Sequence, residues 1–342
     1  QKLNIDAVGI SGDLTVDLGG AGVGLDDFAN LSSGALPSFV GEGDVSLALD
    51  QLGQLTELNG VTANLTASLD NLAASGIDSI SIEQLNTAGV LGATADLRTL
   101  ESAISASNTN TIGLPNALSL EISDRQANAL ADLSGTNAFS FANDGADVLL
   151  DSAGATHLST SLKDLQKLNI DAVGISGDLT VDLGGVGGGL DDFANLSSDA
   201  LPSFIGEGEV SLALDQLGQL TEISSLNTNT LTSSLDNLAA AGVDQISIEG
   251  LAVSGVSASA NLADLTTLES AISASNITAG PGTLSLAVSD SQANALADIS
   301  GFNFSATDSA DVILDSAGAT HLSTSLKDLQ KLNIDPLVLV VI

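Results

Sequence analysis

A tandem duplication is the feature that most constrains what this chain can fold into. The segment QKLNIDAVGISGDLTVDLGG at 1–20 recurs without change at 166–185. The segment LDSAGATHLSTSLKDLQKLNID at 150–171 recurs without change at 314–335. Self-similarity at a fixed long period is the sequence signature of a repeat architecture or of duplicated domains. The fold is therefore expected to be built twice.

Successive copies begin at Gln1, Gln166 and Gln330, which gives periods of 165 and 164 residues. We divide the chain into a first repeat copy at 1–165, a second copy at 166–329, and the truncated start of a third copy with a divergent apolar tail at 330–342. Two copies followed by a fragment suggest a piece of a longer array.

Within each copy, a short helical pattern followed by a β-type pattern recurs. In TASLDNLAASGIDSISIE at 66–83, Leu69 and Leu72 form a helical stripe, Gly76 is placed to end the helix, and an alternating strand follows. A similar helix and strand are expected in STSLKDLQKLNIDAVGIS at 159–176. In SDRQANALADLSG at 123–135, Ser123 and Gln126 form a capping box and Gly135 is expected to end the helix.

The helix starts, near 67, 95, 124 and 159, lie roughly 30 residues apart. A helix that leads into a strand at such a period predicts an α/β fold, a repetitive right-handed βαβ solenoid-like array, because parallel strands need crossover connections. The alternative is two compact α/β domains in tandem. The first 60 residues of each copy show a more β-rich pattern, for example in GISGDLTVDL at 9–18 and GDVSLALD at 43–50.

Composition excludes several classes of function. The chain has 43 acidic and 7 basic residues, with a net charge of −36, so we expect no nucleic-acid partner, since that binding depends on basic side chains. There is no Cys, which excludes disulfides and thiolate chemistry. No apolar run approaches the ~20 residues of a membrane span, so no membrane insertion is expected.

Stretches such as LKDLQKLNIDAVGIS, LDNLAASGIDSISIE and LSLEISDRQANALADL resemble the tandem-repeat regions of very large bacterial secreted or cell-surface proteins of the adhesin and RTX types. The resemblance implies an extracellular or cell-surface location and a structural or adhesive role. We therefore expect a non-catalytic structural repeat segment of an extracellular bacterial fibre, surface layer or giant adhesin, one that self-associates into a filament or lattice. The alternative is a glycan- or ligand-binding solenoid module of a cell-surface protein.

Two glycine-rich segments are candidate calcium sites. AGVGLDDFA at 21–29 and VGGGLDDFA at 186–194 match most of the calcium-binding nonapeptide G-G-x-G-x-D-x-U-x, with Asp26 and Asp191 as the metal ligands. Each copy has one isolated match, and a plain turn before a short helix explains the same residues. Weak, multi-site calcium binding to acidic pairs such as Glu207 and Glu209 is a separate expectation, since it relieves the repulsion among carboxylates.

No catalytic residue is expected, and the chain is interpreted as a protein that is not an enzyme. His157 and His321 lie in identical GATHLSTSL contexts, but no G-x-S-x-G elbow accompanies them. A structural role at the start of the following helix is the favoured interpretation.

The end of the chain departs from the repeat. After Asp335 the sequence reads PLVLVVI instead of AVGISGD. A strand so apolar is a candidate for strand addition to another chain, with the edge near Leu3–Ile10 as receptor, and its deletion is then expected to abolish end-to-end assembly. The alternative is a last strand packed within its own array. The candidate assembly residues are Pro336, Leu337, Val338, Leu339, Val340, Val341 and Ile342.

Overall fold

The computed structural model describes most of both copies. The described residues are 5–17, 36–49, 62–82, 90–110, 117–142, 147–152, 154–184, 201–214, 228–248, 259–278, 284–305, 311–315 and 321–334. They form two compact units. Unit 1 holds Gln1–Ser152 and Lys167–Gly174, and unit 2 holds Ala153–Gln166 and Ile175–Ile342. Each unit therefore includes a short segment from the other side of the boundary between copies.

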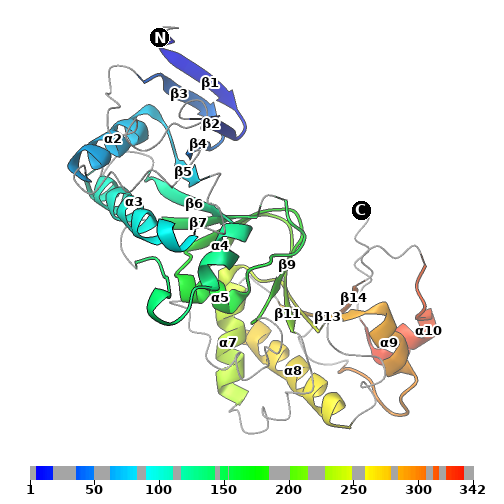
Figure 1. Ribbon diagram of the computed structural model, residues 1–342. Coiled ribbons are helices and arrows are strands. Elements are labelled where there is room, and N and C mark those ends of the chain that lie inside the picture. The colour runs from blue at the N-terminus through cyan, green and yellow to red at the C-terminus, as the bar shows by residue number, and fades with distance from the viewer. Residues whose placement is uncertain are drawn as a thin grey trace. The chain divides into compact units, whose positions relative to one another are not determined.

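The described elements of the first copy begin with strands and continue as alternating helices and strands (Figure 1). They are β1 (Ala7–Ser11), β2 (Leu14–Asp17), β3 (Ser38–Glu42), β4 (Val45–Leu49), α2 (Thr62–Ser75), β5 (Ser79–Ile82), α3 (Val90–Asn110), β6 (Ser119–Ser123), α4 (Asp124–Ala131), the 3-10 turn η4 (Gly135–Asn137), β7 (Asp147–Asp151) and α5 (Leu162–Leu168).

The second copy repeats this order. Its elements are β8 (Ala172–Ser176), β9 (Leu179–Asp182), β10 (Ser203–Glu207), β11 (Val210–Leu214), α7 (Thr228–Ala241), β12 (Gln245–Ile248), α8 (Ser259–Thr278), β13 (Ser285–Ser289), α9 (Asp290–Ala297), β14 (Asp311–Asp315) and α10 (Leu326–Leu332).

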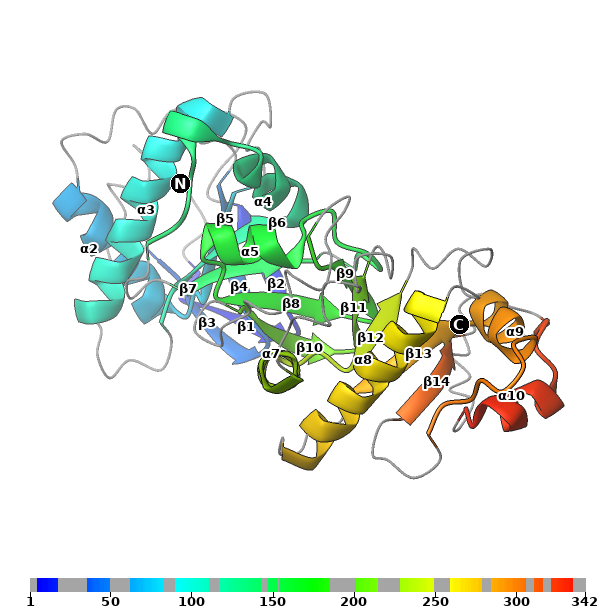
Figure 2. The same ribbon diagram turned by 90° about the horizontal axis from the view of Figure 1, so that it is seen from below.

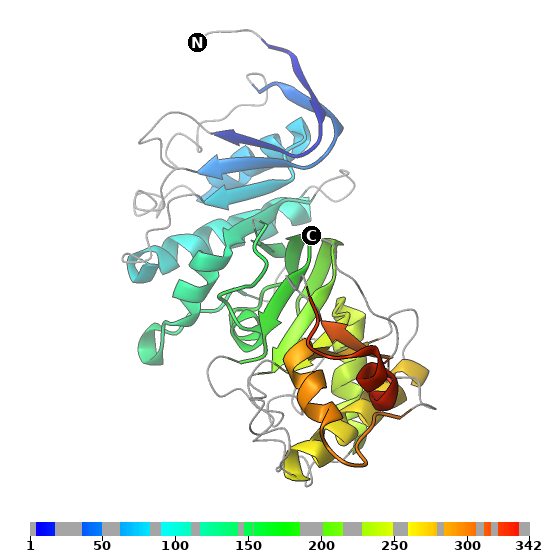
Figure 3. The same ribbon diagram turned by 90° about the vertical axis from the view of Figure 1, so that its right-hand side faces the viewer.

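The strands of each unit pair in parallel. In unit 1 the order is β2-β4-β5-β6-β7-β8, and β1 pairs separately with β3. In unit 2 the order is β9-β11-β12-β13-β14. The strands at the N-terminal end of unit 1 lie side by side in Figure 3. The expected α/β class with parallel sheets is thus confirmed.

The interleaved order at the start of each copy comes from bent strands. β1 and β2 are one extended run bent at Gly12, and β3 and β4 are a second run bent at Gly43. Both glycines have positive φ, and a Cβ on Gly43 would lie 2.3 Å from the carbonyl carbon of Gly12. Two runs bent at the same level can pair along both halves only if the backbones approach this closely, which requires glycine.

From β4 to β8 and from β11 to β14, each strand joins to the next through a crossover that contains a helix. Neighbouring helices contact one another, namely α2 with α3, α3 with α4, α7 with α8 and α9 with α10. Figure 2 shows α8 against β13 and α9 beside α10. When neighbouring parallel strands follow chain order and all crossovers have the same handedness, the crossover helices lie on one face of the sheet. The contacts between neighbouring helices agree with helices on one face.

The core lies between helices and sheet. In β6, Leu120 and Ile122 are buried, whereas Ser119, Glu121 and Ser123 alternate with them and are only half-buried. The helices contribute the expected stripes, and Leu69, Leu72, Leu97 and Leu100 are all buried. Alternation of period 2 therefore gives the sheet of unit 1 one apolar face and one more polar face at β6.

A short motif ends the helices and starts the strands. Gly76 has positive φ, its N–H donates to the carbonyl of Ala73, and the N–H of Ile77 donates to the carbonyl of Leu72. This is a Schellman motif, and it confirms Gly76 as the end of α2. Gly242 ends α7 in the same way, and Asn333, at φ 55°, ends α10.

One expected helix end was wrong. The capping box of Ser123 and Gln126 is present at the start of α4, but the helix ends at Ala131 and Gly135 begins η4 instead. Asp132, the C-cap, keeps right-handed helical dihedrals, so no glycine is needed at this helix end.

Among the described residues, no helix is long and apolar enough to cross a bilayer.

Candidate assembly surfaces

The boundary between the two copies is built by strand addition. Within unit 1, β8, from the start of the second copy, pairs in parallel with β7, and Leu149, Leu150 and Asp151 lie opposite Ala172, Val173 and Gly174. The backbone N–H of Phe141 donates to the carbonyl of Leu168 at 2.9 Å. The Asn169 side chain returns a bond of 2.8 Å to the carbonyl of Phe141. The end of one copy is thus completed by the first residues of the next.

In unit 2, the last residues of the first copy contact β9 of the second copy. The N–H of Leu158 donates to the carbonyl of Thr180 in β9 at 2.9 Å, and the N–H of Thr180 donates to the carbonyl of Thr156 at 2.9 Å. Further on, the N–H of Lys163 donates to the carbonyl of Leu183 at 3.1 Å. The segment before α5 therefore pairs with β9 through one parallel β-bridge, between His157 and Thr180.

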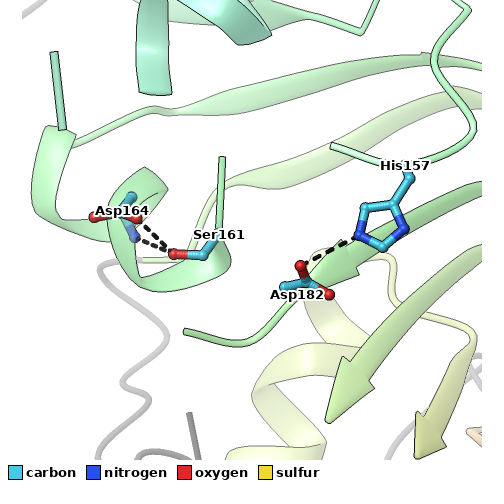
Figure 4. Close-up of polar contacts among 4 residues, drawn as sticks. All are labelled: His157, Ser161, Asp164 and Asp182. Carbon is cyan, nitrogen blue, oxygen red and sulfur yellow. Dashed lines mark hydrogen bonds and ion pairs between the residues drawn. The ribbon is translucent and has the colours of Figure 1, made fainter. Parts of the chain in front are cut away.

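A histidine and a carboxylate face each other at this bridge. His157 Nε2 is 3.2 Å from Asp182 Oδ2, with both side chains more than a third exposed (Figure 4). Ser161 instead donates to the Asp164 carboxylate at 2.7 Å and accepts the backbone N–H of Asp164 at 3.2 Å, which is an N-cap of α5. In Figure 4, Ser161 points to Asp164 and away from the His157–Asp182 pair. The drawn side chains thus show a strand contact and a helix cap.

The same sequence has different burial at the internal boundary and at the end of the second copy. The segment HLSTSLKDLQKLNID occurs at 157–171 and at 321–335. Leu162, at the start of α5, is 0% exposed, whereas the equivalent Leu326 of α10 is 79% exposed. Leu158 is buried, and the equivalent Leu322 is only half-buried. Because the local sequence is identical, the difference comes from the residues that follow in the second copy.

The start of the first copy shows the complementary difference. Ile170 is 3% exposed, whereas the equivalent Ile5 is 51% exposed. Leu179 and Val181 of β9 are buried, whereas the equivalent Leu14 and Val16 of β2 are half-buried. β1 has a single strand neighbour within the described part of the chain, and so does β14. The two ends therefore expose the two halves of the contact that is buried at the internal boundary.

Carboxylates cap the starts of strands across each unit. Asp78 and Asp244 accept the backbone N–H groups of Val45 and Val210, at 2.9 and 2.8 Å. In unit 2, Asp178 also accepts the N–H of Glu209 at 3.1 Å.

The charges gathered at this strand start affect Glu209. Burial, and then the charges of Asp178 and Asp244, raise the pKa of the Glu209 carboxyl, while a hydrogen bond from Gln245 opposes the rise. Asp178 and Asp244 thus have two effects at this strand start. Their carboxylates accept backbone hydrogen bonds, and their negative charges repel the carboxylate of Glu209.

The expected calcium ligands Asp26 and Asp191 lie outside the described residues. Within the residues that are described, no group of three or more His, Asp or Glu side chains is placed to hold a metal ion. The seven candidate assembly residues 336–342 also lie outside the described part.

The polar face of the sheet in unit 1 carries a row of hydroxyl groups. Glu121 of β6 accepts hydrogen bonds from Ser79 at 2.8 Å and from Ser46 at 3.1 Å, across three adjacent strands. In unit 2 the position of Glu121 is taken by Ala287, and Ser211 donates to Ser247 at 3.2 Å instead. Sequence reasoning did not identify this row, because it depends on the register between strands that are far apart in the chain.

No protein-family model matches the chain, and neither does any curated protein or solved structure.

Proposed function

We propose that the chain is a structural, non-catalytic repeat segment of an extracellular bacterial fibre, surface layer or giant adhesin. In this proposal successive copies form one solenoid-like array, in which the first bent strand of each copy adds to the sheet of the copy before it. The observation that carries the proposal is the contrast between Leu162, which is 0% exposed, and Leu326, which is 79% exposed in the same sequence context.

The burial of apolar side chains at the copy boundary favours a continuous array over independent domains. A solvent-exposed Leu at a helix start contributes nothing to a copy that stands alone, but it stabilises a junction when a neighbour covers it. Repeat proteins behave this way, because each repeat buries its open face only against its neighbours. Parallel strands that follow chain order also let the sheet grow indefinitely by one copy at a time.

The remaining parts of the proposal rest on composition and resemblance. A net charge of −36 keeps an array soluble and favours weak binding of calcium at many sites. The repeat stretches quoted above resemble those of secreted and surface proteins, which supports an extracellular location.

The test is to compare purified chains of two, three and four copies by electron microscopy and small-angle X-ray scattering. A continuous array predicts a rod whose length grows by a fixed increment for each copy. Beads joined at variable distances would contradict the array and favour two compact domains in tandem.

A second candidate is glycan or ligand binding on the polar sheet face, which the Glu121, Ser46 and Ser79 contacts favour because hydroxyl and carboxylate groups recognise sugar hydroxyls. A glycan array probed with folded protein tests it, with Glu121→Ala as the matched control. The second copy already has Ala287 at this position. Binding that E121A removes supports the candidate, and the absence of any hit excludes it.

A further inference from the structure

We propose that a second copy of this chain docks on the C-terminal end of the first, through β1–β2 of one chain and β14 with the start of α10 of the other. The inference rests on the proposed function, because the contact is the internal copy boundary made between two chains.

The register follows from the internal boundary. β14 has the sequence DVILD where β7 has DVLLD, and β1 has the sequence AVGIS, identical to β8. β7 and β8 pair with Leu149 opposite Ala172 and Leu150 opposite Val173. The same parallel pairing between chains places Ile313 opposite Ala7 and Leu314 opposite Val8.

The apolar surfaces match in the same register. At the internal boundary Leu158, Leu162, Leu179 and Val181 are all buried. At the ends of the chain their equivalents Leu322, Leu326, Leu14 and Val16 are half-buried or exposed. Docking of the two ends removes all four side chains from water together, which is the main driving force available to such a contact.

One histidine–carboxylate pair gives the contact its direction. His157 lies 3.2 Å from Asp182 at the internal boundary, and their equivalents are His321 at the C-terminal end and Asp17 at the N-terminal end. This contact joins an imidazole on one end only to a carboxylate on the other end only, so it fixes which ends meet. The two surfaces differ from each other, so the contact is heterologous and joins molecules head to tail, which excludes a symmetric dimer.

Two features compete with docking. The net charge of −36 repels a second copy, so association is expected to need salt, and about 0.5 M NaCl shortens the Debye length to about 4 Å. By the repeat register, residues 336–342 align with 172–178 at the internal boundary, so this tail is a second occupant for the edge of β14.

The first test is sedimentation velocity in high salt from micromolar to near-millimolar concentration. The wild-type chain should form a series of oligomers. Val16→Asp and Leu326→Asp each place a charge in the contact and should raise the dissociation constant about tenfold or more. Val40→Asp, at a side chain that is 58% exposed on β3, is the matched control and should change nothing.

A mixture separates head-to-tail docking from other modes. V16D retains an intact C-terminal end and L326D retains an intact N-terminal end, so an equimolar mixture should form heterodimers and stop there. Oligomers that survive in both single variants, or a mixture that stays monomeric while the wild type associates, would overturn the proposal.

The second test uses the absence of cysteine. Asp17→Cys together with His321→Cys, treated with a short bis-maleimide, should give a covalent ladder of multimers. His157→Cys with Asp182→Cys tests the same geometry inside one chain and should cross-link without multimers. Monomers only from the first pair, under conditions in which the second pair reacts, would overturn the proposal.

Deletion of Pro336–Ile342 distinguishes the two occupants of the β14 edge. Docking of β1–β2 predicts association that is unchanged or stronger in the truncated chain. Abolished association would show that the tail is itself the contact and would overturn the proposal. Loss of docking between separate chains, with a regular rod for chains of several copies, would refute this inference and leave the proposed function standing.

Discussion

The most informative perturbation is the same substitution at two positions of identical sequence. Leu162→Ala removes a side chain that is fully buried at the start of α5, and Leu326→Ala removes its equivalent, which is 79% exposed at the start of α10. The helix propensity and the neighbouring residues in sequence are the same at both positions. Any difference between the two variants therefore measures what the following copy contributes.

The magnitude can be worked from burial. Leu→Ala at a fully buried site costs about 2–5 kcal/mol, whereas an exposed substitution stays within about 0.5 kcal/mol. Leu162 belongs to a unit of about 180 residues, for which 1 kcal/mol shifts the Tm by about 2–4 °C. With about 3 kcal/mol for L162A, we expect its Tm to fall by about 6–12 °C and that of L326A to change by about 2 °C or less.

The assay is thermal and urea unfolding followed by circular dichroism, at low protein concentration so that separate chains do not cover Leu326. The wild type and both alanine variants are measured together, with a check that the m-value is unchanged. Equal destabilisation by the two substitutions would refute the reasoning, because Leu326 would then be as buried as Leu162.

Four further predictions follow from the geometry and the composition. Burial opposes ionisation of Asp290, but hydrogen bonds from Ser323 and Thr324 outweigh it and lower the pKa to about 2. This carboxylate therefore stabilises the fold fully above about pH 4, and the contribution is lost as the pH falls through about 2. The Tm difference between wild type and D290N should therefore shrink to a small fraction of its pH 7 value by about pH 2, and a difference that does not shrink would contradict it. Gly206→Ala should lower the Tm by several degrees, because its Cβ would meet the Ile175 carbonyl oxygen at 2.0 Å, while Gly301→Ala, with open space around it, should cost less. Millimolar calcium should raise the Tm relative to chelator by mass action, and identical melting curves would defeat the calcium proposal. Reductant should leave the melting curve unchanged, because the chain has no cysteine.

Much of the local structure could be predicted, because its causes are local. The Leu stripe of 66–83 with Gly76 after it gave α2 and its end, and Ser123 with Gln126 gave the start of α4. Those signals depend on backbone groups only a few residues apart, so a sequence window contains all of the physics.

Other features depend on contacts between distant segments, and the sequence pattern could not supply them. The bends at Gly12 and Gly43 need two runs about 30 residues apart to touch. β3 (SFVGE) and β7 (DVLLD) lack the alternation of apolar and polar residues that marks a half-buried strand. The Glu121 hydroxyl row depends on strand register. The exposure of Leu326 was least predictable of all, since Leu162 has the same neighbours in sequence and is buried.

The central claim, that a following copy covers the end of the one before it, is tested most directly by thiol labelling in this cysteine-free chain. L326C and L162C are each labelled with maleimide under native conditions, in the present chain and in a chain in which a third copy replaces Pro336–Ile342 after Asp335. We predict that L326C reacts like a free thiol in the present chain and becomes as protected as L162C when the third copy is added. An L326C thiol that stays fully reactive in the three-copy chain would contradict the account.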